Sequence, residues 1–164
     1  MRRKSLHLLV ASTAVAVGVG AASAAAQAMT VTVGSPVTLT NRLLATVPIT
    51  VSCDPWDATL TQFGSAINVT LDQAAGRAIA HGEGSVSGFF PAAQLYLCDG
   101  SPHRYPVSVQ ADTSGPPFHG GPAVGNADAV TYAGIPCDPN QTFLCFYNQV
   151  SQVGGSGPIG VTMH

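Results

Sequence analysis

Apolar and polar residues alternate along several short stretches of the chain, with the two-residue period of a β-strand. Every second residue is apolar between positions 47 and 53, and the alternation returns over 67–72, 105–109 and 159–163. On a strand, this period places one set of side chains on a buried face and the other on a wet face. Each stretch is therefore predicted to be a half-buried strand.

Other stretches extend this set. Residues 31–33 and 37–39 are predicted to open the sheet, and the apolar runs 95–98 and 143–147 suit strands that are buried on both faces. Clusters of Gly, Pro, Asn and Asp, which favour turns, separate the stretches at 74–76, 99–102 and 114–117. No part of the chain after residue 28 sustains a helical period. The pattern predicts an all-β domain, an antiparallel sandwich of about seven to nine short strands.

The beginning of the chain has a different pattern. Residues 2–4 are basic, an apolar run covers 6–22, and an A-x-A motif follows at 26–28. These three features define a secretory signal peptide, and the glycines and polar residues in the run favour cleavage over an uncleaved anchor helix. We expect 1–28 to be a cleaved signal helix and 29–164 to be one exported, disulfide-linked domain without a membrane anchor. The export route stays open.

All four cysteines, Cys53, Cys98, Cys137 and Cys145, follow the predicted cleavage site. An exported protein reaches an oxidising compartment, so two disulfides are expected. Four cysteines allow three pairings. Cys53 and Cys98 each end a predicted strand on its inward phase, which favours a bridge between them through the core and leaves Cys137 for Cys145.

Removal of the signal peptide changes the charge of the protein. Three arginines and no lysine remain against eight acidic residues, which gives a net charge of −5 with histidines neutral. Nucleic acids and anionic lipids attract basic surfaces, which this domain lacks. We therefore expect no binding to nucleic acid or to a membrane surface.

Several short motifs follow one another between residues 47 and 163. They are Val51-Ser52-Cys53, Val69-Thr70-Leu71-Asp72-Gln73 with Gly76-Arg77, Gly82-Glu83-Gly84, Cys98-Asp99-Gly100, Tyr105-Pro106-Val107-Ser108-Val109, and Phe118 with Gly121-Pro122-Ala123. With the late cysteines, this succession resembles a family of small secreted immunoglobulin-like domains of unknown function from actinobacteria. The resemblance implies export and an immunoglobulin-like sandwich, and it supplies no catalytic residue. Trp56 departs from antibody-type domains, which place a core tryptophan on the strand after the first cysteine.

The segment 155–161, Gly-Ser-Gly-Pro-Ile-Gly-Val, carries a second likeness. It is similar to the closing strand of neocarzinostatin-type chromoprotein apoproteins, which are acidic, exported, two-disulfide sandwiches that carry an apolar small molecule. That family closes two short disulfide loops, whereas Cys53 and Cys98 lie far apart. The resemblance implies a carrier as an alternative function.

No motif of a catalytic class stands out in the sequence. The stretch 84–88 has the glycines of a nucleophile elbow but valine at its centre, and four paired cysteines leave no thiol nucleophile. Asp54 and Asp57 flank a Pro-Trp pair that is typical of a turn, so we interpret them as solvated turn acids rather than an acid–base pair. We expect no enzymatic activity.

The histidines allow two interpretations. The first interpretation is a surface zinc or copper site. His81 and Glu83 would share one face of a strand, and His103 and His119 lie in predicted loops near acidic residues. The second interpretation is that they are isolated surface histidines. The lack of a recognised ligand spacing favours this second interpretation. We expect no metal and no cofactor.

Sandwich domains commonly bind through their loops. The predicted binding loop is Pro116, Pro117, Phe118 and His119, because it combines a stiff backbone with an aromatic ring and an imidazole. The alternative interpretation of Phe118 is structural: its ring would fill the end of the core as a plug. The expected function is a secreted binding or cell-surface interaction module for an unknown protein or small-molecule ligand. A carrier, and a protease inhibitor that uses the loop 138–144, are the alternatives.

Overall fold

Nine strands and no helix make up the described part of the computed structural model, which comprises residues 28–89, 95–137 and 146–164. The strands are β1 (Met29–Val33), β2 (Thr38–Asn41), β3 (Leu44–Cys53), β4 (Thr61–Ala75), β5 (Ala78–Phe89), β6 (His103–Ala111), β7 (Gly121–Pro136), β8 (Phe146–Gly155) and β9 (Ile159–Met163). The predicted all-β antiparallel fold is confirmed, and the strand number lies at the upper end of the expected range. The predicted signal helix lies outside the described residues, and within them no helix could cross a membrane.

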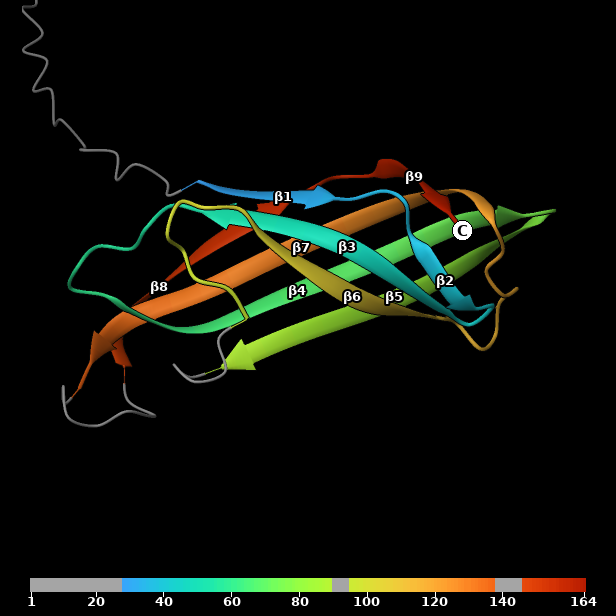
Figure 1. Cartoon of the computed structure of the whole chain (residues 1–164). Coiled ribbons are helices and arrows are strands. Elements are labelled where there is room, and N and C mark those ends of the chain that lie inside the picture. The colour runs from blue at the N-terminus through green and yellow to red at the C-terminus, as the bar shows by residue number, and fades with distance from the viewer. Residues whose placement is uncertain (1–27, 90–94, 138–145) are drawn as a thin grey trace, which may run out of the picture.

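The strands form a rolled sheet whose two layers face each other (Figure 1). One layer contains β1, β2, β3 and β6, and the other contains β5, β4, β7, β8 and β9. The layers join where β5 and β6 pair, at Gly82 with Ala111 and at Glu83 with Gln110. They also join where Val37 and Leu39 form backbone hydrogen bonds with Thr162 and His164. On the opposite side β1 lies against β7 and β8. One core fills the space between the layers.

Glycines make the junction of β5 and β6 possible. A Cβ atom at Gly82 would lie 2.6 Å from the carbonyl oxygen of Gln110, and one at Gly84 would overlap the carbonyl oxygen of Ser108. The β6 backbone therefore occupies the space of two side chains, which only glycine permits. These two glycines lie inside a strand, where they set how closely the layers approach.

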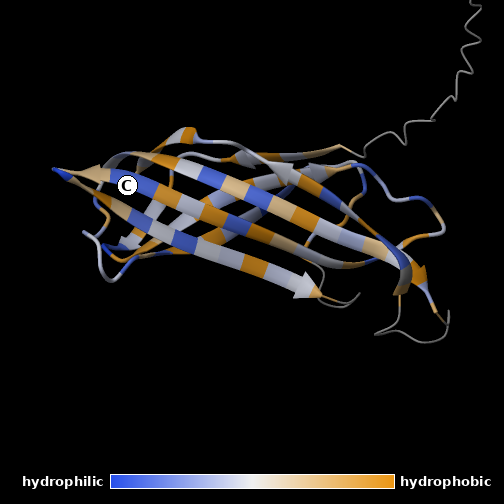
Figure 2. Ribbon diagram, turned by 180° about the vertical axis from the view of Figure 1, so that it is seen from behind, coloured by the Kyte–Doolittle hydropathy of each residue, from blue (hydrophilic) through white to orange (hydrophobic). Residues whose placement is uncertain are grey.

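The predicted alternation is the inside–outside pattern of the observed strands. Val47, Ile49 and Val51 of β3 are buried in the core, as are Ile67 and the other inward residues of β4. Figure 2 shows hydrophobic and hydrophilic residues alternating along the strands of the β5–β4–β7–β8 layer. The period-two pattern thus places both faces of these strands correctly.

Other elements differ from the prediction. Residues 95–98 do not form a strand: this segment crosses the end of the sandwich, and its backbone bonds to side chains of β4. Conversely, the long strands β5 and β7 were not apparent from the sequence, because Gly and Ala occupy many of their inward positions. Such small residues weaken an apolar pattern while allowing neighbouring backbone to approach. Of the predicted run 143–147, residues 143–145 lie outside the described residues.

Candidate functional site

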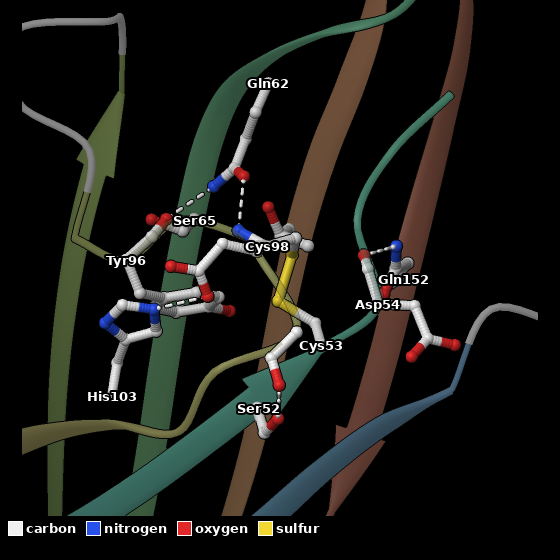
Figure 3. Close-up of a disulfide and its surroundings, with 12 residues drawn as sticks. Ser52, Cys53, Asp54, Gln62, Ser65, Tyr96, Cys98, His103 and Gln152 are labelled. Carbon is white, nitrogen blue, oxygen red and sulfur yellow. Dashed lines mark hydrogen bonds and ion pairs between the residues drawn. A yellow bond between two sulfur atoms is a disulfide. The ribbon is translucent and has the colours of Figure 1, made fainter. Parts of the chain in front are cut away.

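The Cys53–Cys98 disulfide lies at one end of the sandwich and confirms the pairing favoured by strand phase (Figure 3). It joins the end of β3 to the segment 95–98, and both cysteines are buried. Cys137 is disulfide-bonded too, but its predicted partner Cys145 lies outside the described residues. Every described cysteine is thus oxidised, as in proteins of oxidising compartments.

Gln62 of β4 holds the segment 95–98 beside the disulfide (Figure 3). Its Nε2 donates to the carbonyl oxygen of Tyr96 at 2.5 Å, and its Oε1 accepts from the N–H of Cys98 at 3.0 Å. A bulge in β4 between Gln62 and Gly64 brings this side chain to the inner face. The amide thereby supplies the hydrogen bonds that a neighbouring strand would otherwise make.

Tyr96 closes this end of the core. Its ring is 2% exposed, and its hydroxyl donates to the carbonyl oxygen of Val130 at 2.8 Å. Burial raises the pKa of the hydroxyl far above its usual value, so it remains a neutral donor. Both observations assign Tyr96 a structural role.

The predicted binding loop lies at the opposite end, between β6 and β7. Phe118 is 0% exposed, Pro116 and Pro117 are half-buried, and His119 is exposed. The N–H of Phe118 donates to the carbonyl oxygen of Arg42 at 2.8 Å. The burial of Phe118 supports the alternative, a plug at the end of the core, and removes its ring from any contact surface of the loop.

Gln73, a second inward glutamine of β4, holds this loop. Its Nε2 donates to the carbonyl oxygen of His119 at 2.7 Å, and its Oε1 accepts from the N–H of His119 at 2.9 Å. The imidazole faces the chain itself, with Nε2 3.1 Å from the carbonyl oxygen of Ala74 and Nδ1 2.9 Å from that of Gly120. His119 is therefore engaged within the protein, and the loop presents few free groups to a ligand.

His81 lies between two carboxylates on the outward side of β4 and β5. Its Nδ1 is 2.7 Å from Asp72 Oδ1, and its Nε2 is 3.4 Å from Glu83 Oε1. The hydrogen bond to Asp72, followed by the one to Glu83, raises the pKa of His81. The arrangement suits an imidazolium between two anions. In the described part of the chain, no three His, Cys, Asp or Glu residues are arranged to hold a metal ion.

The outer face is the surface of the β5–β4–β7–β8 layer that points away from the other layer, and one half of it is apolar. The ring of Phe63 stacks on those of Phe146 and Tyr132, with centroid distances of 4.4 and 6.1 Å. The ring of Phe89 covers Gly64 on the neighbouring strand. We define the apolar patch as these rings and the adjoining outward side chains: Phe63, Ala66, Phe89, Val130, Tyr132, Phe146 and Val153.

The other half of the outer face is acidic. Asp72, Glu83 and Asp128 are exposed there, and the outward strand positions of this layer carry no lysine or arginine. The arginines of the described chain lie in turns or on β6. A hollow of about 450 Å³ opens in this half, lined by Asn68, Val69, Thr70, Glu83, Gly84 and Ser85.

Sequence reasoning missed the apolar patch because its members come from four strands, two of which gave no clear periodicity. A usable signal exists at Phe89 and Tyr132, which are aromatic residues on the polar phase of their strands. Phe89 is 45% exposed, and Val153 of β8 is 66% exposed. Apolar side chains at several solvent-facing strand positions indicate a surface that has a function other than contact with water.

Comparison of the chain with protein-family models, with curated proteins and with solved structures finds no match. The resemblances drawn from short motifs stay predictions.

Proposed function

We propose that the protein is a secreted, non-enzymatic binding module whose contact surface is the outer face of the β5–β4–β7–β8 layer. The observation that carries this proposal is the apolar patch. A solvated sheet face places polar residues on its outward phase, whereas here aromatic and aliphatic side chains from four strands adjoin one another. Phe89 and Val153 are exposed in this patch and the other members are half-buried, and adjoining apolar side chains on an outer face are typical of sites that contact another molecule.

Export is supported by two independent features. The first 28 residues have the pattern of a cleaved signal peptide, and the described cysteines are oxidised. The resemblance of short motifs to small secreted immunoglobulin-like domains is in line with an exported protein. That resemblance implies a place outside the cytoplasm and leaves the partner open.

The outer face is a better contact surface than the loop between β6 and β7. The one aromatic ring of that loop, Phe118, fills the core, and His119 bonds to its own chain. Phe89 and Tyr132, by contrast, stand on strands, where their rings lose little conformational freedom on contact. Rigid aromatic groups are also enriched in protein interfaces.

The carrier alternative has one supporting feature, a hollow of about 530 Å³ lined by Asn41, Arg42, Leu43, Leu44 and Gln110. Carrier sites enclose most of the surface of a small molecule. This hollow lies at a hairpin and is walled mainly by that hairpin, so it suits a carrier poorly. The inhibitor alternative depends on the loop 138–144, which lies outside the described residues.

The proposal is tested by mapping partner contacts. Protein secreted by an expression host is immobilised and exposed to envelope and medium proteins of the native cell, and cross-links are located by mass spectrometry. We expect retained partners to cross-link to the outer face, and the double variant Phe89→Ser with Val153→Ser to lose them. Leu43→Ser is the matched control, because Leu43 is 54% exposed but lies at the β2–β3 hairpin.

The control also defines the contrary result. Partners that the patch variant retains as well as the wild type does, or that Leu43→Ser loses to the same extent, would show that the apolar patch is not the contact surface. Circular dichroism and thermal melting of each variant exclude loss of fold as the cause.

A further inference from the structure

The outer face has an open edge along β5. This strand pairs with β4 from Ala78 to Phe89 but with β6 only at Gly82 and Glu83. No described strand pairs with residues 85–89 on their other side, whereas the β6 backbone still lies against Gly84. The edge of an unpaired strand presents N–H and C=O groups at the spacing that an additional strand requires.

Residues 85–89 lack the features that usually protect such an edge. Natural edge strands are blunted by lysine, proline, bulges or inward charges. The stretch reads Ser-Val-Ser-Gly-Phe, without charge or proline, and its register with β4 is uninterrupted. Its side chains are small apart from those of Val86 and Phe89. A further backbone can therefore approach this edge.

Two recognition features lie along the same side of this edge. Glu83 and Phe89 are six residues apart, so both side chains point to the outer face. Glu83 lines the hollow of about 450 Å³ with Asn68 and Ser85, whose side-chain oxygens can accept hydrogen bonds. Phe89 belongs to the apolar patch. The edge thus has an anionic, hydrogen-bonding end and an aromatic end.

We propose that the β5 edge binds an extended cationic polypeptide segment, which adds a strand to the outer sheet. An apolar residue of this segment lies against Phe89, and a Lys or Arg four residues away on the same side, opposite Ser85, reaches into the hollow that Ser85 and Glu83 line. Backbone hydrogen bonds supply affinity in such strand addition, and alternate side chains supply specificity. The inference rests on the proposed function and names the partner of the outer face.

Charge favours this occupant over a second copy of the chain. The outer face has three exposed carboxylates, two of which share His81 as their partner, and no lysine or arginine at its outward strand positions, and the exported domain has a net charge of −5. A second copy would bring further negative charge to this surface, whereas a cationic segment brings the opposite sign. Because residues 85–89 are themselves uncharged, self-pairing of this edge with that of a second copy is the competing result to be measured.

The test uses a labelled peptide, Val-Thr-Ser-Thr-Lys, and its reversed sequence, so that either strand direction is sampled. Binding to the secreted protein is followed by fluorescence anisotropy at low salt. We expect one of the two peptides to bind, replacement of its Lys by Glu to weaken binding at least tenfold, and N-methylation of alternate backbone nitrogens on its pairing side to abolish it.

Protein variants locate the peptide. Ser87→Lys places a cation on the edge and is expected to weaken binding at least tenfold, whereas Thr32→Lys makes the same charge change on an exposed position of β1 and leaves binding unchanged. Glu83→Gln is a milder second variant that removes only the charge in the hollow. It is expected to reduce the advantage of the Lys peptide over the Glu peptide.

Three results would overturn the inference. They are equal binding of the Lys and Glu peptides, insensitivity to N-methylation, and a dimer in sedimentation that Ser87→Lys dissociates. The proposed function fails independently, through partners that survive the Phe89→Ser and Val153→Ser changes. Partners that are lost with those two changes but retained by Ser87→Lys would uphold the outer face and refute strand addition at its edge.

Discussion

The two ends of the sandwich are closed in the same manner but secured differently. At each end a glutamine of β4 holds a crossing segment by its side-chain amide, and the segment inserts an aromatic ring into the core. Gln62 holds the segment of Tyr96, and Gln73 holds that of Phe118. The first segment is also tied to β3 by the Cys53–Cys98 disulfide, whereas the second has no such bond.

This difference separates two sources of rigidity. A disulfide keeps the Tyr96 segment close to β3 even when individual hydrogen bonds open. The Phe118 segment depends on packing and on hydrogen bonds alone, so losing either acts directly on its attachment. We therefore expect local opening to begin at the Phe118 end.

The largest effect is expected from Phe118→Ala. Truncation of a fully buried phenylalanine leaves a cavity, and we expect a loss of about 4 to 5 kcal/mol in the free energy of unfolding. Phe118→Leu retains most of the volume and should cost about 1.5 kcal/mol or less. Urea unfolding followed by circular dichroism measures both. A loss below about 1 kcal/mol for the alanine variant would contradict the role of Phe118 as a plug.

The paired change Cys53→Ala and Cys98→Ala tests the end of the sandwich that the disulfide secures. For a sequence separation of 45, chain entropy predicts a loss of about 4 kcal/mol. The same change at Cys137 and Cys145, which would open the short predicted loop, should cost about 2.5 kcal/mol. Urea unfolding without reductant provides the comparison. A larger loss for the short loop would show that loop length does not determine the contribution of the bridges.

The two glutamines allow a direct comparison of the ends. Gln73→Ala leaves the backbone N–H and C=O of His119 without partners, which should cost about 2 to 3 kcal/mol. Gln62→Ala should cost about half as much, because the disulfide still holds its segment. In protein without the 53–98 bridge, the cost of Gln62→Ala should rise to that of Gln73→Ala. A double-mutant cycle measures this coupling, and additive losses would contradict it.

The smallest effect is expected for His81, which lies on the surface and not at the ends of the core that Tyr96 and Phe118 close. Because its pKa is raised in the folded state, its contribution to stability is fully present below the unfolded pKa and is lost as the pH rises through the folded value. His81→Gln should therefore cost about 0.5 kcal/mol near pH 6 and nothing near pH 9. Thermal melts across this range test the sign, with His164→Gln as a control at the exposed chain end.

Local periodicity is enough to predict part of this fold. The alternation over 47–53 and 67–72 places β3 and β4 correctly, and the phase of Cys53 indicates that it points inward. Turn residues between the stretches exclude long helices and lead to the sandwich class. These predictions succeed because the direction of successive side chains on a strand is a property of the strand itself.

Tertiary structure alone decided the remaining features. Gln62 turns inward through a bulge, and Gly82 and Gly84 are required by the β6 backbone, which arrives from a distant part of the chain. The segment 95–98 leaves the sheet because β4 side chains satisfy its backbone. The apolar patch likewise exists only once four strands lie side by side. Each feature depends on which segments meet and how much space they leave, and these relations are absent from any local stretch of sequence.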